Sequence, residues 1–307
     1  GLPLGVQLSL LVANRIISYL ALAQIMVFGL IIIVCGYTAA ALVSKPSLFF
    51  LTLLMAGLSI GPLEVAVNLE ADRVEYGLKH RIINRSHAFW SLGFFATGLS
   101  GALMAQLGVP VVFHFAGFGL IIVALTIFSF SGFTQAPPRP SANTGTPKFV
   151  RPSAAIMVLV GLTLSAMLAE GSAIDWSVIY MRDIFKTLPL INGLALALTA
   201  FFQFITRYFA DNFVVQYGPR KVAKICLWIM LAGVILVAVA PVWPLALVGF
   251  ACLGAGSSVI FPLAMSAAAQ MKDRSAAVNV AALAQISFVV FLLAPPLLGV
   301  VAEYIGI

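Results

Sequence analysis

The sequence predicts an all-α membrane protein, and three observations lead to this prediction. Only 9% of the 307 residues are charged, whereas an ordinary soluble domain carries about 25%. Hydrophobic residues make up 62% of the chain, and the mean hydropathy is +1.10. Apolar runs of about 20 residues, enough to cross a bilayer as helices, follow one another along the chain. This composition cannot supply a charged surface, so a soluble enzyme, a nucleic-acid-binding domain and a disordered chain are excluded.

Four complete spans are expected in the first part of the chain, each beginning after a loop residue. They are expected at 16–43 after Arg15, 47–69 after Lys45, 86–107 after Arg85 and 109–131 after Gly108. Residues 1–13 look like the end of a further span.

Five more complete spans are expected in the second part by the same criterion of apolar length. They are expected at 153–181, 188–216, 222–241, 244–270 and 276–303. The chain is therefore expected to hold nine complete spans and part of a tenth.

A polar linker separates the two sets of spans. Residues 131–153 contain five prolines, three basic residues and no acidic residue, a composition typical of a flexible connection. We therefore expect an N-terminal helical half at 1–131, a cytoplasmic linker at 132–152 and a C-terminal helical half at 153–307.

The basic residues predict the orientation of the spans. Alternating across each span places 13 Lys and Arg residues on one side and three on the other. Loops rich in Lys and Arg stay in the cytoplasm, so the side with 13 is expected to be cytoplasmic. The net charge of +7 thus marks a membrane face, and we expect a multi-pass protein of the plasma membrane without a nucleic-acid partner.

The two halves are expected to repeat each other. Three landmarks recur at similar offsets: Gly101–Gly108 with Gly299–Gly306, residues 71–73 with 272–274, and Arg15 with Arg220. Such order indicates a parallel internal repeat. Matching the halves predicts six helices in each, of which the chain holds about 9–10 of 12. The first helix, most of the second and the last would lie outside this sequence.

Two six-helix halves and a basic central linker resemble the major facilitator superfamily. The best local match is the stretch 207–221, which resembles the superfamily's loop motif and includes Arg207, Asp211, Gly218 and Arg220. The resemblance implies a gating loop at these residues, while simple anchoring of the loop is the alternative. In the first half the motif is eroded, with Ser9 where an Asp is usual.

Two further stretches resemble narrower branches of that superfamily. Residues 63–68, Leu-Glu-Val-Ala-Val-Asn, resemble the fourth helix of fucose:proton symporters, and residues 169–183 are similar to the seventh helix of bacterial inner-membrane transport proteins. The likeness implies a secondary active transporter for a sugar-like or other small polar solute, coupled to protons, in the bacterial inner membrane. A monomer without cofactors is expected.

Two acidic residues are the candidate proton-coupling groups. Glu64 lies deep in an expected span, where a carboxylate is costly unless it is neutralised or faces water. Glu170 lies in the expected seventh helix. The alternative for Glu64 is a structural carboxylate that is hydrogen-bonded to a neighbouring helix, and the alternative for the region of Glu170 is an outer-interface belt.

Four residues are candidates for substrate binding: Asn68, Trp90, Asp175 and Trp176. Asn68 lies one helical turn after Glu64 and on the same face, where it is a candidate hydrogen-bond partner of Glu64 or of a ligand. For Trp176 the alternative is an interfacial belt, where Trp and Tyr collect in membrane proteins.

Other function classes fit the sequence less well. Gly98-Leu-Ser100-Gly resembles the motif of intramembrane rhomboid-type proteases, with His114 as a conceivable base, but small residues are common in membrane helices because they allow close packing. We therefore expect no enzyme, no metal site and no ATP-driven pump. Proton-driven efflux of amphiphilic compounds and a sensor that binds without transporting are the remaining alternatives.

Overall fold

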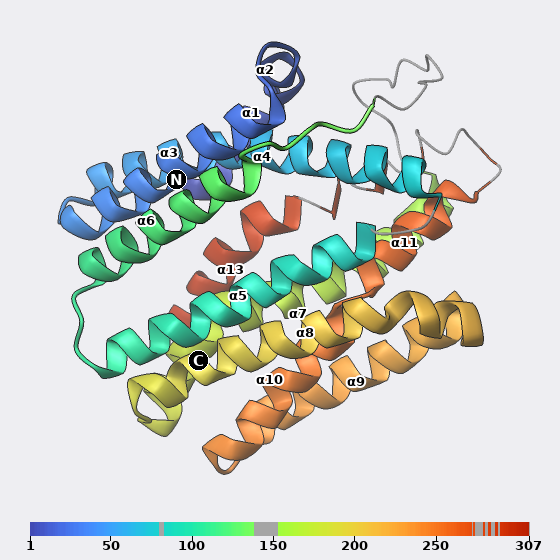
Figure 1. Ribbon diagram of the computed structural model, residues 1–307. Helices are drawn as coiled ribbons and strands as arrows, with labels where there is room; N and C mark the ends of the chain where they lie inside the picture. The colour runs from blue at the N-terminus through green and yellow to red at the C-terminus, as the bar shows by residue number, and fades with distance from the viewer. Residues whose placement is uncertain are drawn as a thin grey trace. The chain divides into compact units, whose positions relative to one another are not determined.

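The computed structural model describes residues 1–79, 83–137, 153–271 and 289–306, together with 273, 279, 282–283 and 286–287. In these residues the chain is helical apart from short turns and connections and contains no strand (Figure 1). The helices group into two compact units, which are described separately.

The first unit contains five helices, most of which pack on one long helix. They are α1 (Leu2–Leu10), α2 (Ala13–Tyr19), α3 (Leu22–Leu42), α4 (Pro46–Leu78) and α6 (Val111–Phe130). Helices α1, α2 and α3 contact α4, and α6 contacts α3. Gly5 and Gly57 bring α1 close to α4, because a Cβ atom on either residue would collide with the backbone of the other helix. The absence of side chains at these two positions therefore sets the helix separation.

The start of α3 differs from the expected span. The expected start at residue 16 is wrong, because the backbone is extended at Leu20 and Ala21 and separates α2 from α3. The Gln24 side-chain oxygen accepts the N–H of Ala21 at 2.9 Å and caps the new start. Hydropathy alone missed this break because the residues on both sides of it are mostly apolar.

Helix α4 continues to Leu78, well beyond the expected end at residue 69. The extension is rich in Glu, Ala and Arg, which favour helix without being strongly apolar. Glu70 within it is buried, with 8% of its surface exposed. One Glu70 oxygen lies 3.4 Å from Arg73 Nη1, and the other accepts the N–H of Ala136 at 2.6 Å. This carboxylate therefore fixes the chain that follows α6 onto α4.

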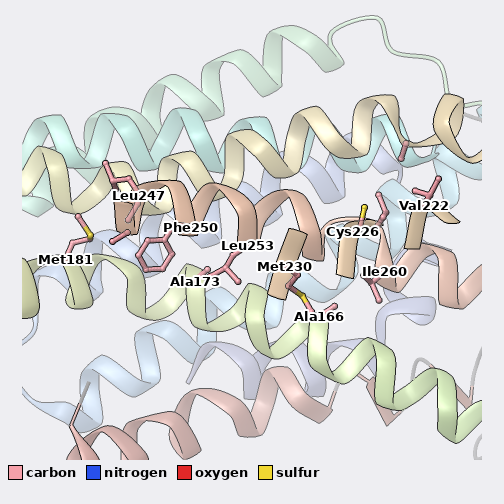
Figure 2. Packing of buried hydrophobic residues seen from close by; sticks show 14 residues of the cluster. Ala166, Ala173, Met181, Val222, Cys226, Met230, Leu247, Phe250, Leu253 and Ile260 are labelled. Carbon is pink, nitrogen blue, oxygen red and sulfur yellow. The ribbon is translucent and has the colours of Figure 1, made fainter. Parts of the chain in front are cut away.

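The second unit contains seven described helices. They are α5 (Ile83–Gln106), α7 (Ala154–Phe185), α8 (Pro189–Tyr217), α9 (Pro219–Val239), α10 (Trp243–Ser257), α11 (Ile260–Ala269) and α13 (Val289–Ile305). Helix α10 contacts α7, α8 and α9. Figure 2 shows the core they share, in which Phe250 and Leu253 of α10 lie with Met181 of α7 and Met230 of α9.

Prolines and one glycine define where the helices of this unit begin. Pro189, Pro219 and Pro244 occupy the first turns of α8, α9 and α10, where the missing N–H costs nothing. Gly218 joins α8 to α9 with φ +80°, a conformation that a side chain would disfavour.

Eight helices are long and apolar enough to cross a membrane, by length and composition, among the residues that the structure describes. Seven are α3 to α9, and the eighth is the stretch Trp243–Ala268, which comprises α10 and most of α11. The ninth expected span, 276–303, is described only from residue 289 in its continuous part, where α13 contains a shorter apolar helix, Leu293–Tyr304. Most of its first half lies outside the described residues.

Several features agree with the expected repeat. Gly108 follows α5 and Gly306 follows α13, and both have positive φ, +70° and +92°. Ser59 of α4 donates a hydrogen bond to the carbonyl three residues earlier, and so does Ser258 at the end of α10. These serines precede Pro62 by three residues and Pro262 by four.

Candidate functional site

Arg207 of α8 binds three groups from other segments of the second unit. Its Nη2 lies 3.4 Å from Glu170 Oε1 of α7, its Nη1 donates to Ser91 Oγ of α5 at 3.0 Å, and its Nε donates to the Ser258 carbonyl at 3.1 Å. Only 15% of the Arg207 side chain and 12% of the Glu170 side chain are exposed. A guanidinium and a carboxylate are thus paired inside segments long enough to span a membrane.

The break between α10 and α11 explains why Arg207 finds a free carbonyl. In a continuous helix the Ser258 oxygen would accept the N–H of residue 262, but Pro262 has no N–H. The helix is interrupted at Ser258 and Val259, and Arg207 Nε supplies the missing donor. Arg207 lies on α8, and it therefore stabilises the interruption between α10 and α11 from a neighbouring helix.

Ser91 and Gln203 extend the cluster into a chain of hydrogen bonds. The Ser91 hydroxyl accepts from Arg207 and donates to Gln203 Oε1 at 2.9 Å. Ser91 is fully buried and Gln203 is 2% exposed. The Gln203 Nε2 group has no hydrogen-bond partner within the described part of the chain. The hydrogen-bond chain thus ends in a buried donor without an acceptor.

Helix α5 lies antiparallel along α8 and brings Ser91 to this place. Near one end, Gln106 Oε1 accepts the N–H of Leu190 at 3.3 Å. Near the other end, the Arg85 guanidinium lies 5.6 Å from the centre of the Tyr208 ring. Ser91 lies between these two contacts along α5, opposite Gln203 and Arg207 of α8.

Similar proteins are known among bacterial transporters. No family model matches the chain. It is 26% identical over 306 residues to the uncharacterized transporter y4wD of Sinorhizobium fredii, covering 98% of this chain and 80% of that one. It is 26% identical over 320 residues to the uncharacterized MFS-type transporter YhhS of Escherichia coli K12, covering 96% of this chain and 73% of that one. An uncharacterized MFS-type transporter of Yersinia pestis is 24% identical over 265 residues, covering 85% of this chain and 67% of that one.

A solved structure decides the fold. The crystal structure of the human organic anion transporter MFSD10 covers 99% of this chain, and this chain covers 78% of it, with a TM-score of 0.60 and 16% sequence identity. The chain has the major facilitator fold. The names of the bacterial relatives support a membrane transporter of the MFS type.

Both predicted proton-coupling carboxylates lie in helices long enough to span a membrane, but the two helices belong to different compact units. Glu64 lies on α4 in the first unit and is exposed, whereas Glu170 lies in the second and is paired with Arg207. The Asn68 amide donates to the backbone carbonyl of Glu64 at 2.9 Å. The structure thus shows Asn68 bonded to the Glu64 backbone rather than to its carboxylate, and the alternative that Asn68 binds a ligand stays a prediction.

The other predicted substrate-binding residues are not gathered around Arg207. Trp90 is half exposed and packs on Phe94, with ring centres 4.5 Å apart. Asp175 is exposed. Trp176 faces α13, where a Cβ atom on Gly299 would lie 3.9 Å from its ring. Their roles in substrate binding stay predictions.

The predicted gating residues lie along the end of α8 and the start of α9. The sequence suggests Asp211, four residues after Arg207, as the partner of that arginine, but Arg207 binds Glu170, Ser91 and Ser258. Asp211 is partly buried and Arg220 is exposed. Gating by this loop stays a prediction.

The alternative protease motif lies inside a regular helix. Ser100 is within α5 and donates to the Thr97 carbonyl at 2.9 Å. It thus occupies an ordinary helical position. Among the described residues, no three His, Cys, Asp or Glu side chains are grouped to hold a metal ion.

Sequence reasoning identified Glu170 and Arg207 but missed Ser91, Gln203 and Ser258. Two signals in the sequence pointed to the latter two. Gln203 is a polar residue one turn before Arg207 and therefore on the same helix face. Pro262 lies four residues after Ser258 and leaves its carbonyl without a helical donor.

Proposed function

We propose that this chain is a secondary active transporter that moves a small polar solute across the membrane by alternating access, coupled to protons. The observation that carries the proposal is the Glu170–Arg207 pair within α7 and α8. Ionisable residues inside spans are costly and mark substrate or proton pathways. The names of the bacterial relatives support transport as the activity.

Proton coupling follows from what protonation would do to this pair. A protonated Glu170 is neutral and no longer balances the charge of Arg207. The attraction between α7 and α8 then weakens, and the arginine becomes available to another acceptor. A carboxyl group whose protonation changes a helix–helix contact is suited to coupling proton movement to rocking of the helices.

Glu64 is the second proposed coupling group. Its side chain lies within the span α4, where a carboxylate is costly unless it is neutralised or faces water. Asn68, Trp90, Asp175 and Trp176 are the proposed contacts for a sugar-like or other polar solute. Asp211, Gly218 and Arg220 are proposed to form the gating loop together with Arg207.

Proton flux in proteoliposomes tests the proposal for many solutes at once. The purified chain is reconstituted with a pH-sensitive dye in the lumen, and a panel of sugars and small polar metabolites is added. A transported solute is expected to change the lumenal pH in wild type, and Glu170→Gln and Glu64→Gln are each expected to reduce that change at least about tenfold. Glu303→Gln, an exposed position on α13, is the matched control.

The same experiment separates the competing functions. Solute binding without any proton or solute flux would favour a sensor and contradict the carrier. Exchange of protons only against amphiphilic compounds would favour the efflux alternative. Full coupling in Glu64→Gln together with loss in Glu170→Gln would remove Glu64 from the mechanism and leave the carrier in place.

A further inference from the structure

The hydrogen bonds around Arg207 run in one direction. Arg207 donates to Ser91, Ser91 donates to Gln203 Oε1, and Gln203 Nε2 donates to no group in the described part of the chain. A buried amide donor without an acceptor is costly and rare. Because only 2% of Gln203 is exposed, bulk water does not reach most of it. The site therefore contains a buried donor group, Gln203 Nε2, that has no acceptor in the described part of the chain.

The missing group must be an acceptor, and its chemistry follows from its neighbours. Arg207 offers a planar fork of N–H donors that matches a carboxylate, and Gln203 offers a further N–H. The present acceptor of Arg207 on the α7 side is itself a carboxylate, that of Glu170. A ligand that replaces Glu170 at Arg207 must supply the same charge and shape.

We propose that Arg207 and Gln203 form a receptor for the carboxylate of a small organic acid, which Glu170 occupies until a substrate displaces it. The proposal rests on the proposed carrier function and specifies its substrate class. In the exchange, the substrate carboxylate accepts from Arg207 and from Gln203 Nε2, and Glu170 leaves the arginine as a neutral acid after taking up one proton. One negative charge and one proton enter together, so the net charge of the site does not change.

Charged or titratable groups of α5, α7 and α8 lie near Arg207 in the described part of the chain, and the Glu170 carboxylate is within ion-pair distance of it. On α7 the facing group is Glu170, and on α8 Asp211 lies one turn after the arginine. On α5, His87 lies close enough to Arg207 for their charges to interact. Helices α10 and α11 carry no charged residue. A ligand carboxylate would therefore take the place of Glu170 at Arg207.

Removing the Glu170 side chain tests the receptor with acetate as the probe. In the full chain carrying Glu170→Ala, acetate is expected to raise the thermal unfolding temperature, whereas acetamide at the same concentration and ionic strength is not. Adding Gln203→Glu keeps the acceptor for Ser91 but removes the free donor, and it should weaken acetate binding at least about tenfold. Gln216→Glu, at an exposed position of the same helix, is the control and should leave acetate binding unchanged. Equal effects of acetate and acetamide on Glu170→Ala would overturn the receptor.

Matched substrates test the proposal on the unaltered protein, in case the variants do not fold. Gluconate and glucose differ in charge but little in size, as do lactate and lactamide. Proteoliposomes with an inward proton gradient are expected to accumulate the carboxylate of a pair and not its neutral partner. Proton-driven accumulation of only the neutral partners would overturn the carboxylate receptor and leave the carrier proposal standing. Absence of proton-coupled flux for every solute, combined with acetate binding to Glu170→Ala, would instead contradict the carrier and support the receptor.

Discussion

Arg207 has a different physical role at each of its three contacts. It neutralises the charge of Glu170, it replaces the helical N–H that Pro262 lacks, and it orients the Ser91 hydroxyl toward Gln203. A lysine has the same charge but a single nitrogen with three donors on a flexible stem, so it does not reproduce this planar arrangement. The residue type at position 207 is thus determined by geometry as well as by charge.

Glu170→Gln is expected to destabilise the protein by about 3 kcal/mol, because it leaves a largely buried guanidinium without its counter-charge. The double variant Glu170→Gln/Arg207→Gln removes both charges and should lose less than the two single variants together, by about 1–3 kcal/mol. Unfolding free energies from denaturant titration in detergent measure both effects. Strict additivity of the two losses would mean that the pair contributes no interaction energy.

At the scale of the helices, the positions of the spans were predictable from the sequence, whereas the contacts of Arg207 with other helices were predictable only in part. Span positions depend on hydropathy within about 20 residues, and α5 to α9 match their expected ranges within a few residues. The contacts of Arg207 join positions that are 37, 51 and 116 residues apart. Such pairings depend on how helices pack, which local composition does not encode. The break inside the expected span 244–270 was likewise missed, because it lies in an apolar stretch.

Comparison of the two equivalent segments shows what interrupts α10 and α11. Helix α4 contains Pro62 and runs through it without a break, so a proline alone does not end the helix here. In the second unit Arg207 binds the Ser258 carbonyl, and the residue at the corresponding place in α1 is Gly5, which has no side chain. The helix is therefore interrupted where both a proline and the Arg207 contact are present, and it continues in α4, where only the proline is present.

Pro262→Ala is expected to weaken proton-coupled uptake about tenfold, because the restored N–H draws the Ser258 carbonyl back into the helix and a hydrogen bond to a charged donor, worth about 1.5–3 kcal/mol, is lost. Pro62→Ala in α4 is the matched control and should leave the coupling intact. Hydrogen–deuterium exchange of peptides covering 256–264 should slow in Pro262→Ala. Faster exchange there would contradict a restored helix.

For the whole molecule, the distribution of Lys and Arg predicts which ends of the spans face the cytoplasm, and the two ends of α8 allow a test of this orientation. Helix α8 begins near Leu188, next to the few basic residues of one side, and ends near Gln216, next to Arg220 and Lys221. The larger number of Lys and Arg on the second side predicts that it faces the cytoplasm. Both Leu188 and Gln216 are exposed, so a cysteine at either position is accessible to a label.

In intact bacterial cells, Leu188→Cys is expected to react with a membrane-impermeant maleimide, and Gln216→Cys to react only after the cells are permeabilised. The physical reason is that one helix carries the two positions to opposite faces of the bilayer. Cys35, Cys226 and Cys252 are replaced by alanine first, so that the new cysteine is the only label site. The reverse pattern would invert the proposed topology and place the 13 basic residues outside, whereas labelling of both positions from outside would mean that α8 does not cross the membrane.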